Sequence, residues 1–254
     1  MRYLFNVFFI LCLTPLAAAY AQITIAGTAF DGLKLFKSSA VGANGLSCAQ
    51  CHATVNEERI DDGLIRAAHS MANAADRETW WGQDPEGPDA YANIAAAAVV
   101  CVEHYMRSQN KLTAQQLLDL EAFLSSINRR PEHDALAIAP AADKTGEYSG
   151  YEGGDKVIGR TLFYAACHTC HPNGEAGIAP AIPRQKPAAF YARKVREGDG
   201  LGAVLSGVDP NAYDPASGQF MPFFGADRLS KDKIRDIIAY ILSLPPVQKS
   251  AKTQ

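Results

Sequence analysis

The sequence has few cysteines, little net charge and only one long apolar run. Its 254 residues carry a formal charge of −3, which excludes nucleic-acid binding by bulk charge. Apolar residues make up 48% of the chain, which excludes a disordered or collagen-like protein. The apolar run stands at the N-terminus, so a protein with several membrane spans is excluded too. Six cysteines are too few for a disulfide scaffold of this length, so their positions matter more than their number.

The first 21 residues have the order of a secretory signal peptide. Arg2 precedes an apolar stretch over residues 4–13, and small residues follow as far as Ala21. The stretch is short for a membrane span, so we expect cleavage after Ala19 or Ala21, with an N-terminal anchor as the alternative. Cys12 would be removed with this segment. The sequence therefore predicts export to the periplasm, an oxidising compartment in which unpaired cysteines normally form disulfides.

Four of the five remaining cysteines form one pentapeptide twice. The two copies are Cys48-Ala49-Gln50-Cys51-His52 and Cys167-His168-Thr169-Cys170-His171. The C-x-x-C-H pattern is typical of covalent haem attachment, in which two thiols add to the vinyl groups and the imidazole coordinates iron. A zinc site would need a closed set of four ligands, and a thiol redox motif would begin a strand and helix unit that the sequence lacks. We therefore predict two covalently bound haem c groups.

A glycine and an aromatic residue precede each motif at the same spacing. Gly32 stands four residues before Phe36, and Gly159 stands four residues before Phe163. This spacing puts both residues on one face of a helix, where the glycine allows another helix to approach closely.

An amphipathic segment follows each motif. Residues 112–124 and 229–242 carry apolar side chains at helical spacing, and Thr113 is a candidate N-cap for the first of them. Each segment contains an aromatic residue, Phe123 or Tyr240. Each unit therefore consists of a helix, a haem motif, a connecting segment and a closing helix.

This order resembles the class I cytochrome c fold, twice over, across nearly the whole mature chain. The resemblance implies an all-α protein with two tandem cytochrome c-like domains, each of which binds one haem. We expect the first domain at residues 22–130 and the second at residues 155–254. Residues 131–154 contain prolines and glycines without apolar periodicity, which predicts a linker.

The second unit carries candidates for the other contacts of a haem. Met221 stands fifty residues after His171, and together with Pro222 it resembles the Met-Pro ligand loop of cytochromes c. Met221 is therefore expected to bind iron, with a role as core filler as the alternative. Residues 177–180 resemble the family loop whose proline carbonyl accepts the proton of the proximal imidazole, which assigns that role to Pro180.

The first unit departs from this pattern, because no proline follows His52 before Pro85. The candidates for its sixth iron ligand are Cys101, Met106, Met71, His69 and His104. Cys101 is favoured since it follows His52 by forty-nine residues, nearly the spacing of His171 to Met221. Met106 is the first alternative, because it precedes the closing helix at a distance similar to that of Met221.

Two further resemblances concern the first unit. The segment from Cys101 to Leu112 resembles the distal-cysteine segment of dihaem thiosulfate dehydrogenases and of the dihaem subunit of sulfur-oxidising complexes. There, a thiolate-ligated haem is the catalytic centre and a second domain passes electrons on. Residues 35–52 look like the entry to the first haem of dihaem cytochrome c peroxidases. A small buried hydrophobe is the alternative role for Cys101.

The favoured prediction is an exported dihaem cytochrome c that carries single electrons between periplasmic redox proteins. We expect no nucleic-acid partner and no integral membrane segment in the mature chain. An oxidoreductase acting on a sulfur compound, with Cys101 on the first iron, is one alternative. A peroxidase-like dihaem enzyme is the other. Cys101 is the one candidate catalytic residue.

Overall fold

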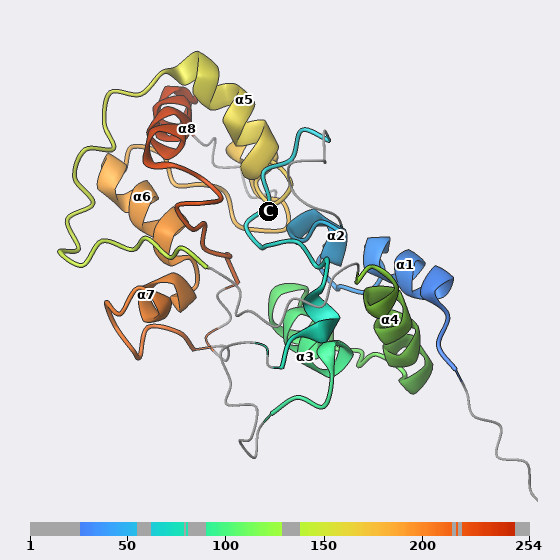
Figure 1. The fold of residues 1–254 in the computed structure, drawn as a ribbon. Helices are drawn as coiled ribbons and strands as arrows, with labels where there is room; N and C mark the ends of the chain where they lie inside the picture. Colours follow the sequence, from blue (N-terminus) through green and yellow to red (C-terminus); the bar gives the residue numbers. More distant parts are fainter. Residues whose placement is uncertain are drawn as a thin grey trace, which may run out of the picture.

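The computed structural model describes residues 26–54, 62–78, 80, 90–128, 138–214, 217 and 220–246 (Figure 1). These residues form helices and loops with no strand among them, which confirms the all-α prediction for this part of the chain. No helix in these ranges is long and apolar enough to cross a membrane. The predicted signal peptide lies outside the described residues.

The helices follow one another in two groups, before and after residue 138. In chain order they are α1 (Ala29–Lys37), α2 (Cys48–Cys51), the 3-10 turn η2 (Ala74–Asp76), α3 (Ile94–Val100), the π-helical turn η3 (Cys101–Tyr105), α4 (Ala114–Ser126), α5 (Lys156–Ala166), the 3-10 turn η4 (Pro172–Gly174), α6 (Ala188–Glu197), α7 (Leu201–Leu205) and α8 (Lys231–Ser243). Figure 1 shows α1 beside α4 in one part of the molecule and α5 beside α8 in another. We call these two parts the first and the second unit.

The helices that open and close each unit begin at capping side chains. Thr28 caps α1, Thr113 caps α4, Asp155 caps α5 and Ser230 caps α8. Each side-chain oxygen accepts a hydrogen bond from a backbone N–H of the first turn, which would otherwise lack a partner. The predicted N-cap at Thr113 is therefore confirmed.

In the first unit, α1 crosses α4 at a glycine. Gly32 lies against the carbonyl of Asp119 so closely that a Cβ atom would have no room. One turn farther, the rings of Phe36 and Phe123 meet with their centroids 5.4 Å apart and their planes at 55°. The carboxylate of Asp119 accepts a hydrogen bond of 2.8 Å from Thr28 N, which ties the start of α1 to α4.

In the second unit, α5 crosses α8 through the same contacts. Gly159 lies against the carbonyl of Asp236, and the rings of Phe163 and Tyr240 meet at 5.2 Å and 55°. Asp236 accepts a hydrogen bond of 2.8 Å from Asp155 N. The predicted role of the two glycines is confirmed. The two aspartates were missed, although each stands four residues before the aromatic residue of its helix.

Residues 138–154 lie within the range predicted as a linker, and they pack on the second unit. Tyr148 and Tyr151 are buried in its hydrophobic core. The hydroxyl of Tyr148 donates a hydrogen bond of 2.8 Å to Glu197. Gly146, Gly150 and Gly153 adopt positive φ in the turns between these contacts, which explains the linker-like composition. The domain boundaries themselves stay predictions.

We predict that Gly159→Ala destabilises the protein by about 1–3 kcal/mol, because the added methyl group forces α5 away from α8. This figure is the net effect, after the gain of about 1 kcal/mol that alanine brings in helix propensity. Chemical denaturation of the purified protein measures the difference. Thr161→Ala, at an exposed position of the same helix, is the control. A Gly159→Ala protein as stable as the control would contradict the prediction.

Candidate functional site

Both C-x-x-C-H segments fold into the same turn. His52 N donates to Cys48 O at 2.9 Å, and His171 N donates to Cys167 O at 2.9 Å. Cys48 and Cys51 are the ends of α2, and Cys170 N donates to Cys167 O at 3.2 Å. In both turns, two thiols one helical turn apart precede the imidazole, as covalent haem attachment requires.

In the second unit, the imidazole of His171 is oriented by the predicted proline. Its Nδ1 lies 2.9 Å from the carbonyl oxygen of Pro180, so Nδ1–H donates and the lone pair of the neutral ring is on Nε2. Burial lowers the pKa of His171, which favours this neutral form. The predicted hydrogen bond to Pro180 is therefore confirmed.

In the first unit, a different residue has this role. His52 Nδ1 lies 2.8 Å from the carbonyl oxygen of His69, so the backbone of His69 does for His52 what Pro180 does for His171. From the sequence, His69 is a candidate only through its side chain, as a ligand of iron. A backbone acceptor leaves no signature in residue type, so sequence reasoning could not find this contact.

The thiols of the two turns fit haem attachment better than redox chemistry. All five cysteines in the described residues are free thiols. Burial raises the pKa of Cys48 to about 11 and those of Cys51 and Cys167 to about 12. A redox C-x-x-C motif lowers the pKa of its attacking thiol instead. Neutral thiols in apolar surroundings beside an oriented imidazole form a donor set that suits a covalently bound haem.

Met221 lies on a loop that the second unit holds firmly. The side chain is partly buried and packs against the core of that unit. Gly198 adopts φ 63°, and a Cβ atom on it would lie 2.6 Å from Met221 O. Any side chain at this position would therefore displace the loop. Phe224 N donates to Val195 O at 2.8 Å. Iron ligation by Met221 stays a prediction.

Cys101 and Met106 both border the first attachment turn. Cys101 begins the π-helical turn η3, a rare element that often marks a functional site. Burial raises the pKa of its thiol, and the neighbouring Cys48 and Cys51 raise it further. Met106 is 3% exposed and packs in a cluster that includes Cys48. Met71, a weaker candidate, packs against the core formed by α1 and α4.

His69 and His104 both contact carboxylates of the second unit. His69 Nε2 donates to Asp227 Oδ2 at 2.7 Å, and His104 Nε2 donates to Asp199 Oδ2 at 2.9 Å. The side chains of the second pair are 6% and 0% exposed. These Nε2 atoms therefore take part in links between the units.

The two attachment turns meet in a shared apolar cluster. Cys48 and Cys170 both pack against its buried residues, which are Leu46, Val102 and Met106. After burial itself, the nearby Cys170 is the next cause that raises the pKa of Cys51. Ile65 N also donates to Ala165 O at 3.0 Å, which joins a loop of the first unit to the end of α5.

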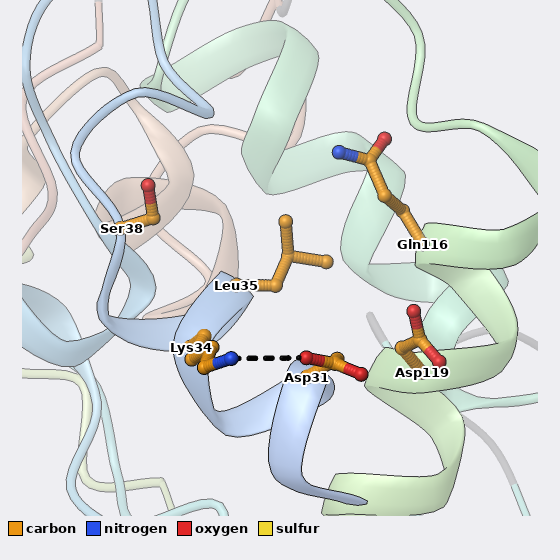
Figure 2. A pocket seen from close by; sticks show the side chains of 6 residues that line it. All are labelled: Asp31, Lys34, Leu35, Ser38, Gln116 and Asp119. Atoms are coloured by element: carbon orange, nitrogen blue, oxygen red, sulfur yellow. Dashed lines mark hydrogen bonds and ion pairs between the residues drawn. The ribbon is translucent and has the colours of Figure 1, made fainter. Parts of the chain in front are cut away.

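A surface hollow of about 330 Å³ lies elsewhere, at the crossing of α1 and α4 (Figure 2). It is lined by Asp31, Lys34, Leu35, Ser38, Gln116 and Asp119, none of which belongs to an attachment turn. Lys34 and Asp31 form an exposed ion pair of 3.3 Å at its edge. This hollow is therefore separate from the candidate haem sites.

We predict that Asp199→Ala destabilises the protein by about 1–3 kcal/mol, because the buried imidazole of His104 loses its acceptor. Asp199 also accepts a hydrogen bond from Leu201 N, so the pair itself needs a double-mutant cycle with His104→Ala. The double variant should be more stable than the sum of the two losses implies. Asp209→Ala, at an exposed position on the other side of α7, is the control. Strict additivity would contradict the importance of the pair.

Comparison with known proteins assigns part of the second unit to a family. Residues 157–245 match the family described as cytochrome c. The matched range contains the second attachment turn, Pro180, Met221 and α8. No curated protein matches the chain. A domain of this family implies a covalently bound haem c and electron transfer at its iron. Residues 157–245 are thus a cytochrome c domain.

Proposed function

We propose that the chain is an exported dihaem cytochrome c that carries single electrons between redox proteins of the periplasm. The observation that carries this proposal is the repetition of one arrangement. Both units contain a glycine crossing, an aromatic pair, an aspartate of the closing helix that bonds to the start of the opening helix, and an attachment turn, in the same order along the chain. The copy in the second unit lies in the cytochrome c domain. The copy in the first unit is therefore proposed to form another haem domain.

Each unit supplies its own attachment residues. In the proposal, Cys48 and Cys51 would bind one haem and Cys167 and Cys170 would bind the other, and His52 and His171 would each coordinate an iron. Met221 would be a further iron ligand in the second unit, and Cys101 or Met106 would be a further iron ligand in the first. A bound haem c supplies exchange of one electron at iron.

The protein contributes orientation and exclusion of water. The carbonyls of His69 and Pro180 hold the two imidazoles in one tautomer. The apolar cluster shared by Cys48 and Cys170 keeps the facing sides of the attachment turns dry. A low local dielectric of this kind helps to set a redox potential. The N-terminal sequence pattern supports the periplasmic location.

We predict two haems per chain, which a pyridine haemochrome assay and the intact mass of the purified protein can count. Replacing both Cys48 and Cys51 by alanine should leave one haem, and so should replacing both Cys167 and Cys170. Cys101→Ala should retain two haems and lose the one remaining free thiol of the mature chain. A wild-type protein with one haem per chain would refute the dihaem proposal.

A second candidate function, oxidation of a sulfur compound, rests on Cys101. Its buried thiol lies close enough to Cys48 and Cys51 for both to raise its pKa after burial. A bound ferric iron would offset the cost of forming the thiolate there. An anionic sulfur compound would need cationic side chains to bind it, and the arginines nearby already have partners. Arg66 pairs with Asp62 at 2.6 Å, and Arg107 stacks over Phe220 at 4.3 Å. Because these cations already have partners, electron carriage remains the first choice.

Low-temperature electron paramagnetic resonance of the oxidised protein distinguishes the two candidates. If Cys101 binds iron, Cys101→Ala should abolish a thiolate-type low-spin signal and leave the signal of the other haem unchanged. Identical spectra for wild type and variant would reject Cys101 as a ligand and support Met106. The peroxidase-like alternative stays a prediction, and failure of hydrogen peroxide to reoxidise the half-reduced protein would reject it.

A further inference from the structure

We propose that Asp227, a residue of the second unit, positions the axial imidazole of the first unit and so sets the midpoint potential of the first haem. The inference rests on the proposed function, because it needs a haem at Cys48 and Cys51. Two hydrogen bonds form the connection. Asp227 Oδ2 accepts from His69 Nε2 at 2.7 Å, and the carbonyl of the same His69 accepts from His52 Nδ1 at 2.8 Å.

A second contact from the neighbouring residue holds the same loop. Arg228 Nε donates to Arg66 O at 2.9 Å, and Arg66 Nε donates to Ala49 O at 3.0 Å. Ala49 lies inside the first attachment turn. Adjacent residues of the second unit therefore hold residues 66 and 69, and these two residues in turn contact the turn that carries His52.

Asp227 is itself held by the core of the second unit. It lies in a turn in which Arg228 N and Leu229 N both donate to Gly225 O, at 3.2 and 3.1 Å. Gly225 O also accepts a hydrogen bond of 3.0 Å from Arg196, whose side chain is buried. A Cβ atom on Gly225 would collide with the carboxylate of Asp227, so the carboxylate packs into space that only a glycine leaves open.

The chemistry of the proximal imidazole gives the direction of the effect. A carbonyl that accepts the Nδ1 proton makes the ring a stronger donor through Nε2, which favours the oxidised metal and lowers its potential. A His69 carbonyl that moves away from His52 therefore raises the potential. In the second unit the acceptor is Pro180, nine residues after His171 in the same unit. The second haem should not depend on Asp227 in this way.

Spectroelectrochemical titration of the full-length, haem-loaded protein tests the inference. In Asp227→Ala, one of the two midpoint potentials should shift to more positive values and the other should stay in place. Met221→His should lower that other potential, which identifies it as the potential of the second haem. Asp227→Asn retains an oxygen that can accept from His69, so its shift should be smaller than that of Asp227→Ala.

Two further variants separate positioning from general effects. Asp232→Ala removes an exposed carboxylate whose partner Arg235 lies on the same helix, and both potentials should stay unchanged. His69→Ala removes the ring and retains the carbonyl, and it should shift the same potential as Asp227→Ala. The double variant should shift it no further than either single change, because both changes break one connection.

The outcomes are distinguishable from a failure of the proposed function. Two haems with unmoved potentials in both Asp227→Ala and His69→Ala would overturn the inference and leave the dihaem proposal intact. Equal shifts of both potentials would overturn it as well, since they would indicate a general charge effect. A wild-type protein with one haem per chain would overturn both proposals.

Discussion

The close crossing of two helices at a glycine is the contact on which each unit depends. It brings the backbone of α1 against α4 and that of α5 against α8, at a separation that any side chain on Gly32 or Gly159 would prevent. The crossing sets the aromatic pairs in the same geometry in both units. In the second unit α5 leads directly into the attachment turn, and its last turn accepts the backbone N–H of Cys167.

Contacts between the units combine an apolar cluster with directional polar pairs. The cluster around Met106 excludes water but does not by itself fix a register, because apolar contacts are non-directional. The pairs His69–Asp227 and His104–Asp199 supply direction. The second pair is buried on both sides, so a wrong register would leave its polar atoms without partners. The polar pairs therefore specify how the apolar surfaces meet.

Local features of the structure could be predicted from the sequence, and contacts between distant residues could not. The glycine crossings and the cap at Thr113 follow from spacing and residue type, and the hydrogen bond at Pro180 follows from the resemblance of residues 177–180 to a loop of cytochromes c. The acceptor at His69 is a backbone atom, which residue type does not reveal. Residues 138–154 look like a linker because glycine turns interrupt their apolar pattern, yet Tyr148 is buried in the second unit.

The two attachment turns differ in whether the contacts that hold their imidazoles come from the same unit or from the other unit. His171 relies on Pro180 within its own unit, whereas the loop that supports His52 bonds to Asp227 of the other unit.

The π-helical turn with both ligand candidates is held by the second unit as well, because His104 within it bonds to Asp199. Met106 N donates to Cys101 O at 2.9 Å, so both candidates move with this turn. The second unit therefore supports both the proximal loop and the candidate distal turn of the proposed first haem. Changes in how the units pack should alter the first site and leave the support of His171 intact.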